Sequence, residues 1–378
     1  MLRRQVLWTI GRVAAAGWMT TRGLSGVAQT RASSAAGARG GAARVALLLP
    51  AADGAFRTAT AAVLAGVRAA HARDGQGVGI EVFVEPVDED EMIALYREFA
   101  ARSTGLVIGP LTRDAVNMLG AIDALPMPTV TLNFPESGAR VPGNALLFGL
   151  SVENEAAQMA RFAFQEARDR APMRYPLAAL AVSNSTPLAR RGAQAFIETW
   201  RSLGGLVLEP VTADTRALGE LRSLLRGKRA DAYFVGLHPD VVIMLRSVVG
   251  LDAPLYGTST LNTGMSQAPG ALPDGELERR LDGVRLVEMP WQVQPAHPAV
   301  MSYQRAPEAI AHLELQRLYA LGIDAFRIAR ERLAGRDEFE LDGVTGRLSV
   351  RARSDDRVGR SMVVCQYLNG VVVPLETQ

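Results

Sequence analysis

The chain has 378 residues, of which 41 are basic, 39 are acidic, 48% are hydrophobic and only one is cysteine. Seven arginines precede Val45 in a stretch without acidic residues, so the remainder carries 34 basic against 39 acidic side chains, a net charge of about −5. That charge gives no electrostatic reason to expect nucleic acid or an anionic membrane surface as a partner, and the lone Cys365 excludes an intrachain disulfide. The length favours two lobes over a single hydrophobic core.

The N-terminal segment has the form of an export signal. Arg3-Arg4 precede the apolar run VLWTIGRVAAAGWM, and small residues follow it, which predicts a signal peptide over 1–28 and a flexible leader over 29–43. The arginine pair loosely resembles a twin-arginine motif, and an ordinary basic n-region explains it about as well. No cysteine lies near the end of the signal, so we do not expect a lipid anchor in the outer membrane.

From Arg44 onward, short apolar runs alternate with stretches of helical period, which is the pattern of βα units on a parallel sheet. The alternation starts afresh after a crossing point at 146–151. The predicted strands of the first half are 44–49, 80–84, 105–109 and 128–132, and those of the second half are 176–183, 205–211, 231–237 and 254–259. Continuous apolar runs indicate strands that are covered by helices on both faces.

The sequence pattern then predicts a return of the chain to the first half, with a strand-like run at 283–291 and the longest helical pattern at 312–334. The last segment has the short strands and turn residues of a hairpin meander. We therefore predict an α/β fold of two lobes, each a mostly parallel sheet with helices on both faces, joined by hinge crossings. The predicted lobes are 44–150 plus 283–340, and 151–282 plus 341–378.

The candidate cleft residues lie where predicted strands end. In doubly wound sheets, ligands bind beyond the carboxyl ends of strands, near helix N-termini. In one such loop, Gly109 and Pro110 precede Leu111 and Thr112; the glycine allows close approach, and Thr112 can cap a helix or offer its hydroxyl to a ligand. A purely structural strand-to-helix turn explains the loop equally well. The other polar, uncharged candidates at strand ends are Thr131, Asn133, Thr258 and Ser259.

Catalytic and cofactor motifs are not found. The four histidines are scattered without ligand-like spacing, no G-x-S-x-G occurs, and Gly227-Lys228 is followed by Arg229 instead of the Ser or Thr of a P-loop. The glycines of 75–79 precede their strand, so we interpret them as a turn, and the acidic run 88–91 as a helix start. We therefore expect no metal, no cofactor and no catalysis.

Two further peptides do not follow the βα rhythm. Met289, Pro290 and Trp291 come directly after the returning strand; burial in the core is the default interpretation, and contact with a ligand or partner at a hinge is the alternative. The segment 342–349, DGVTGRLS, predicts a tight hairpin with both glycines in turn positions.

These peptides also carry a family resemblance. VALLLP (45–50), LVIGPL (106–111), LFGLSVENEA (147–156), YGTS (256–259), LDGVRLVEMPW (281–291), RLYALGIDAFRIA (317–329) and LDGVTGRLSV (341–350) resemble successive landmarks of the LppC/LpoA family. The resemblance implies a fold similar to type I periplasmic binding proteins such as the leucine-binding proteins. It also implies a periplasmic, non-catalytic protein that binds and stimulates a class A penicillin-binding protein. The N-terminal helical-repeat domain of longer members has no counterpart in this sequence.

Two other classes of function stay open. The first is a solute-binding subunit of an ABC importer for a leucine-like amino acid or another small polar ligand. In leucine-binding relatives, a Ser/Thr-rich first lobe takes the α-carboxylate, a role that Thr112 and Thr131 match, and an acid of the second lobe takes the amine. Near Thr258, neither Asp252 nor Glu288 lies in a convincing position for that role. The second class is an enzyme, because a fold alone does not exclude catalysis.

Overall fold

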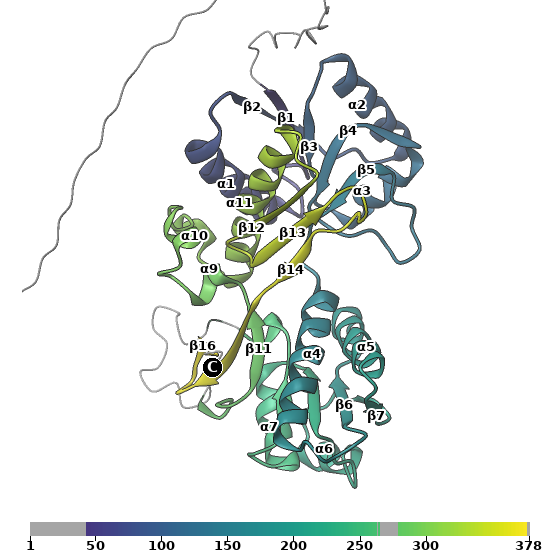
Figure 1. Cartoon of the computed structure of the whole chain (residues 1–378), viewed down its shortest axis with the longest axis vertical. Coiled ribbons are helices and arrows are strands. Elements are labelled where there is room, and N and C mark those ends of the chain that lie inside the picture. Colours follow the sequence, from purple (N-terminus) through teal and green to yellow (C-terminus); the bar gives the residue numbers. More distant parts are fainter. Residues whose placement is uncertain (1–42, 263, 265–278, 376–378) are drawn as a thin grey trace, which may run out of the picture. The chain divides into compact units, whose positions relative to one another are not determined.

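The computed structural model describes residues 43–262, 264 and 279–375. The predicted signal peptide and nearly all of the predicted leader lie outside these residues. A five-stranded parallel sheet with the order β2-β1-β3-β4-β5 forms the core of the first lobe (Figure 1). Its strands are β1 (Ala43–Leu49), β2 (Val78–Val84), β3 (Leu106–Ile108), β4 (Ala124–Thr131) and β5 (Gly143–Leu147). Its helices are α1 (Arg57–Asp74), α2 (Glu89–Ala101), α3 (Arg113–Met118), η1 (Leu119–Ala121) and α11 (Leu313–Leu333).

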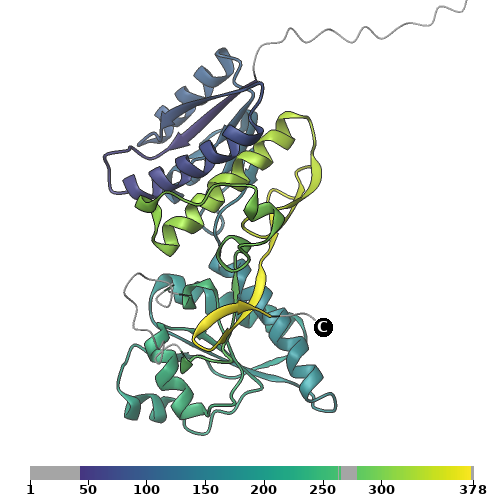
Figure 2. The same ribbon diagram turned by 90° about the vertical axis from the view of Figure 1, so that its left-hand side faces the viewer.

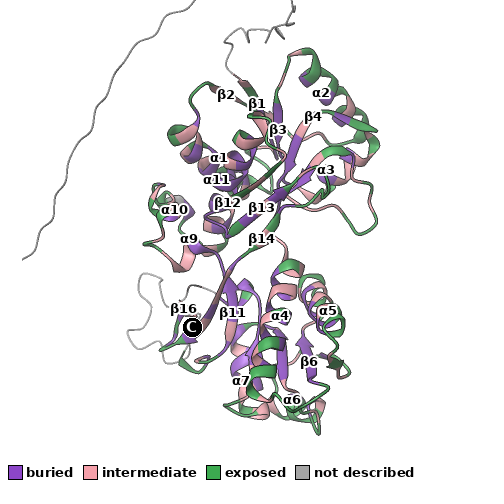
Figure 3. Ribbon diagram, in the orientation of Figure 1, coloured by how far each residue is buried: buried purple, intermediate pink, exposed green. Residues whose placement is uncertain are grey.

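Helix α11 returns from late in the sequence to pack against α1, and the two lie side by side in purple and yellow-green in Figure 2. Small residues permit their close approach. An added Cβ at Gly66 would lie 2.0 Å from the carbonyl oxygen of Tyr319, and one at Gly322 would lie 2.3 Å from that of Val63. The alternating side chains of β1 are buried on both faces, beneath these helices and beneath α2, as the continuous apolar run predicted (Figure 3).

An eight-stranded sheet forms the core of the second lobe. Seven strands follow the order β16-β15-β11-β10-β9-β6-β7, and β8 pairs with β6. The strands are β6 (Ala178–Ser183), β7 (Leu206–Val207), β8 (Val211–Thr212), β9 (Ala232–Gly236), β10 (Leu255–Tyr256), β11 (Arg285–Glu288), β15 (Val363–Leu368) and β16 (Val371–Pro374). The helices and helical turns of this part are α4 (Val152–Arg170), α5 (Pro187–Ser202), α6 (Leu218–Leu224), α7 (Pro239–Val249) and η2 (Ser259–Leu261). Between β11 and α11 lie α9 (Pro290–Val293), α10 (Pro298–Met301) and η4 (Glu308–Ile310).

A small antiparallel sheet, with the order β12-β13-β14, follows α11. Its strands are β12 (Glu338–Asp342), β13 (Arg347–Arg351) and β14 (Gly359–Ser361). The predicted tight hairpin is confirmed, because Asp342 pairs with Arg347 across a turn that contains both glycines. The fully buried carboxylate of Asp324 on α11 holds this turn: it accepts hydrogen bonds from the amide of Val344, 3.1 Å away, and from the amide and hydroxyl of Thr345, both 2.8 Å away.

The predicted α/β fold with two mainly parallel sheets is confirmed, and three details need correction. First, 283–288 was placed with the first lobe, whereas β11 pairs with β10 and β15 in the second sheet. Second, β12–β14 form a separate sheet, although 341–378 was placed with the second lobe. Third, the strand expected over 205–211 is split into β7 and β8 around Pro210, which has no backbone N–H to donate. Hydrophobic patterns show where strands occur, but main-chain pairing decides which sheet they join.

Candidate functional site

The loop between β3 and α3 contains the first group of candidate residues. Gly109 has a φ of +108°, and a Cβ there would lie 2.1 Å from the carbonyl oxygen of Leu48, so only glycine fits. The peptide bond between Gly109 and Pro110 is cis. Thr112 caps α3, because its Oγ1 accepts a hydrogen bond from the amide of Ala115 at 3.3 Å. The loop therefore has the glycine and the helix cap of a strand-to-helix turn, without any need for a ligand.

The donors of this loop bind a carboxylate of the protein itself. Glu85, which follows β2, accepts hydrogen bonds from the amides of Leu111 and Thr112 and from the hydroxyl of Thr112, the last at 2.5 Å. Burial raises the pKa of Glu85, and the hydrogen bonds from Thr112 and Leu111 partly oppose that shift by lowering it. A solute-binding role of the leucine-binding kind would need the Thr112 hydroxyl to bind the carboxylate of a ligand. In this structure, that hydroxyl donates a hydrogen bond to the carboxylate of Glu85 instead.

Thr131 and Asn133 brace the same loop from the end of β4. The Asn133 side-chain amide donates to the carbonyl of Leu111 at 3.0 Å, and the Thr131 hydroxyl donates to the carbonyl of Asn133 at 2.8 Å. Thr131 is fully buried. The structure thus brings all the first-lobe candidates together, and their polar groups bond to one another and to Glu85.

Thr258 and Ser259 lie at the end of β10 in the second lobe and form a separate group. Ser259 donates its amide to the carboxylate of Glu155 at 2.9 Å, and the hydroxyl oxygens of Thr258 and Thr260 are 2.8 Å apart. No hydrogen bond among the described residues joins this pair to the loop at 109–112. Both residues are buried, Thr258 at 2% and Ser259 at 5% exposed, and of the two only Thr258 is among the described residues that line a pocket.

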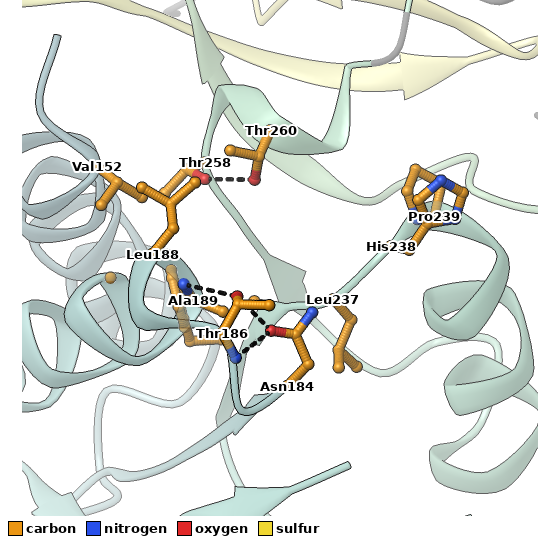
Figure 4. A pocket seen from close by; sticks show the side chains of 13 residues that line it. Val152, Asn184, Thr186, Leu188, Ala189, Leu237, His238, Pro239, Thr258 and Thr260 are labelled. Carbon is orange, nitrogen blue, oxygen red and sulfur yellow. Dashed lines mark hydrogen bonds between the residues drawn. The ribbon is translucent and has the colours of Figure 1, made fainter. Parts of the chain in front are cut away.

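That pocket has a volume of about 210 Å³ and lies at the carboxyl ends of β6 and β9 (Figure 4). Its polar lining consists of hydroxyl, amide and imidazole groups, and none of the described residues that line it carries a carboxylate, guanidinium or ammonium group. All five of these side chains already make a hydrogen bond. The Asn184 amide oxygen accepts from the hydroxyl of Thr186 at 2.6 Å, and Thr258 and Thr260 bond to each other. Nδ1 of His238 accepts from the amide of Asp240 at 3.4 Å. The polar lining residues are Asn184, Thr186, His238, Thr258 and Thr260. A zwitterionic amino acid would find no countercharge in this lining.

A cluster of buried charges lies where β11 ends. Arg317 of α11 is 3% exposed and donates to the fully buried Glu288 with Nη2 and Oε2 2.6 Å apart. Arg317 also donates to the carbonyl of Ser259 at 2.9 Å, and Asn262 donates to Glu288 at 2.7 Å. The cluster therefore ties α11 to β11 and η2 and leaves Glu288 unable to take the amine of a ligand.

Glu155, near the start of α4, belongs to the same cluster. Burial raises its pKa to about 7, against the hydrogen bonds from Ser259 and the charge of Arg317, which lower it; the charge of Glu288 adds to the increase. Sequence reasoning missed Glu85, Glu155 and Arg317. Glu85 directly follows the predicted strand 80–84, and this position at a strand end could have identified it as a candidate, as it did for Thr112 after the strand 105–109. The buried cluster had none, because Glu155 lies 104 residues before Ser259 and Glu288 lies 29 residues before Arg317.

The three hinge or partner candidates are all buried. Met289 and Trp291 are each 1% exposed, and Pro290 begins α9. Trp291 packs against Tyr319 with ring centroids 5.3 Å apart, and its amide donates to the carbonyl of Val344 at 3.0 Å. These residues thus connect α9, α11 and the hairpin turn in the core.

The part of the chain that the structure describes contains no group of three or more His, Cys, Asp or Glu residues that could hold a metal ion. Within the same residues, no helix is both long and apolar enough to cross a membrane. Cys365 is free and buried.

A family model described as "LppC putative lipoprotein" matches residues 39–212 and 228–370. The chain belongs to the LppC family. This assignment confirms the resemblance seen in the sequence. Among curated relatives of this LppC chain is the "Penicillin-binding protein activator LpoA" of Edwardsiella piscicida, 28% identical over 326 residues, which cover 75% of this chain and 44% of the relative. A second LpoA, of Edwardsiella ictaluri, is 28% identical over 356 residues that cover 80% of this chain and 49% of the relative. The LppC chain thus spans about half the length of the curated relatives it matches.

Solved structures show the same fold. The "LpoA (YraM) C-domain from Haemophilus influenzae, a regulator of PBP1A" superimposes with a TM-score of 0.70 at 20% identity and covers 88% of this LppC chain and all of that one. The "putative branched-chain amino acid ABC transporter from Chromobacterium violaceum ATCC 12472" gives a TM-score of 0.68 at 33% identity, over 85% of this chain and 99% of that one. The leucine-binding-like architecture of the LppC chain is therefore established.

Proposed function

We propose that this LppC chain is exported to the periplasm, where it binds a class A penicillin-binding protein and stimulates it without catalysis of its own. The observation that carries the proposal is the family match over 39–212 and 228–370. Its curated relatives are named activators of penicillin-binding proteins. Export by an N-terminal signal over 1–28 is part of the same proposal.

The geometry of the cleft loops supports this function over solute binding. The amides and hydroxyl of Leu111 and Thr112 are hydrogen-bonded to Glu85, and the pocket beside Thr258 lacks charged groups among its described lining residues. A small polar solute would have to displace an internal carboxylate that is already satisfied, at a cost of several hydrogen bonds. We infer that the loop at 109–112 supports the fold and that the partner contacts the outer surface.

The test is reconstitution with purified components. The full chain is added to each class A penicillin-binding protein of the host, and the rates of glycan polymerisation and peptide cross-linking are measured with and without it. We expect saturable binding and an increased rate with at least one synthase, and the same increase with Thr112→Ala. No binding and no stimulation with any of the host's class A synthases would contradict the proposal.

One observation favours a second function, that of a solute-binding subunit for an importer. The Chromobacterium violaceum structure, 33% identical to this chain, is described as a branched-chain amino acid transporter component. A thermal-shift screen of branched-chain and other amino acids tests this alternative, because a ligand at a hundred times its Kd stabilises a protein by about 2.7 kcal/mol. A shift of that size that is lost when Thr258 is replaced by valine would support solute binding in the second lobe.

A further inference from the structure

A basic hollow lies in the second lobe at the amino ends of β9 and β10, the opposite end of the sheet from the pocket at Thr258. Its volume is about 820 Å³. It is bounded by the loop between α6 and β9 and by the last turn of α7. Helices α6 and α7 pack together (Figure 1). Of the described residues that line it, none is acidic and five are cationic: Arg174, Arg222, Arg226, Lys228 and Arg229.

The loop that presents most of these cations has a defined conformation. The amide of Lys228 donates to the carbonyl of Leu225 at 3.0 Å across Gly227, whose φ is +75°. The hydroxyl of the buried Tyr233 accepts from the amide of Ala230 at 3.1 Å. The loop is thus tied to strand β9, so its basic side chains are held on the rim of the hollow.

Three of the five cations have no acidic partner within the part of the chain that the structure describes. Arg174 pairs with Asp231 at 2.8 Å, and Lys228 pairs with Glu209 at 3.5 Å. Among the described residues, no carboxylate lies within 4.0 Å of the guanidinium groups of Arg222, Arg226 or Arg229, all of which are exposed. This concentration of positive charge occurs in a body that carries 34 basic against 39 acidic side chains from Val45 onward.

The lining of the hollow favours a phosphorylated ligand. Guanidinium groups bind phosphate oxygens in a bidentate manner and are less strongly hydrated than ammonium groups, so three of them around a recess favour a ligand with clustered phosphate charge. Leu225 and Tyr233, which also line the hollow, are 5% and 4% exposed and offer little surface to a ligand.

We propose that this hollow binds a ligand that bears two or more phosphate groups, either a phosphorylated lipid headgroup or a soluble polyphosphate compound. Arg222, Arg226 and Arg229 supply the positive charge that the phosphate groups require. The proposed activation of a synthase does not depend on this site, because the hollow contains none of the cleft candidates.

The test measures binding to the full chain and to two triple variants. In R222Q/R226Q/R229Q, three unpaired arginines of the hollow lose their charge. R68Q/R97Q/R161Q removes the same total charge away from the hollow, at three exposed arginines on α1, α2 and α4 that pair with no carboxylate among the described residues. Unfolding midpoints of both variants establish that the fold is retained, and the single variant R226Q serves if the first triple variant does not fold.

Binding of sodium pyrophosphate is measured by calorimetry, and binding of membranes by co-sedimentation with vesicles of phosphatidylcholine alone or with one fifth phosphatidic acid and cardiolipin. We expect saturable binding of pyrophosphate, of the anionic vesicles, or of both, weakened at least tenfold in the hollow variant and less than twofold in the control variant. If the chain binds the anionic vesicles but not pyrophosphate, the ligand is a lipid headgroup. If it binds pyrophosphate but not the vesicles, the ligand is a soluble compound. Absence of saturable binding to either probe, or equal weakening in both variants, would overturn the proposal.

Discussion

Replacing Arg317 with methionine tests whether the buried charge cluster holds α11 to the second sheet. Arg317 is 3% exposed and Glu288 is fully buried, and Arg317 donates to Glu288, to the carbonyl of Ser259 and to that of Asn262. Removing one partner of a buried, hydrogen-bonded ion pair leaves the other charge uncompensated, which costs about 3–5 kcal/mol. We therefore expect Arg317→Met to lower the free energy of unfolding by about 3–5 kcal/mol.

The assay is urea unfolding followed by tryptophan fluorescence, with Glu288→Met and the double variant completing a double-mutant cycle. Two methionines of similar volume leave no unpaired charge in the pair, so we expect the double variant to be more stable than the sum of the single effects by about 2 kcal/mol or more. Arg140→Met is the matched control. The side chains of Arg140 and its partner Asp123 are 55% and 95% exposed, so their ion pair should contribute less than about 1 kcal/mol. A loss below about 1 kcal/mol for Arg317→Met, or strictly additive effects, would refute the reasoning.

Three further predictions concern single positions. Thr112→Ala removes the cap of α3 and a hydrogen bond to Glu85, and should lower the free energy of unfolding by about 1–2 kcal/mol in urea titrations; an unchanged midpoint would contradict the capping role. Gly66→Ala should destabilise the chain by about 3 kcal/mol or more in the same assay, because the new Cβ would lie 2.0 Å from the carbonyl oxygen of Tyr319 and force α1 and α11 apart; wild-type stability would contradict that packing. The pKa of Glu155 is about 7 in the folded chain, against 4.5 for a free glutamate. Its protonation therefore contributes about 3 kcal/mol to the free energy of unfolding below pH 4.5, and this contribution is lost as the pH rises through 7. Glu155→Gln should remove this part of the pH dependence when unfolding midpoints are compared between pH 4.5 and 8, and an identical pH profile in the two proteins would show that burial does not perturb this carboxyl.

The sequence alone predicts the family of this chain and its two-lobed α/β pattern. Both predictions depend on short segments of consecutive residues. The alternation of apolar runs and helical periods follows from the burial of strands between helices, and the cap at Thr112 and the acidic start of α2 at Asp88 follow from unsatisfied amides at helix N-termini. Each of these features depends on residues that are close together in the sequence, so it can be predicted without knowledge of the fold.

Whether a polar group is free to bind a solute or is hydrogen-bonded within the protein depends on the tertiary structure. The hydroxyl of Thr112 was as compatible with a ligand as with a cap, and it took the position of Glu85, 27 residues earlier, to show that an internal carboxylate occupies its donors. The same holds for β11, whose sheet depends on pairing with β15 about eighty residues later, and for Glu155, whose pKa depends on contacts more than a hundred residues away. Hydrogen bonds and electrostatic interactions act over a few ångströms in space regardless of separation along the chain. Their partners are therefore chosen by the fold, whereas the periodicity that builds the fold is already present in the sequence.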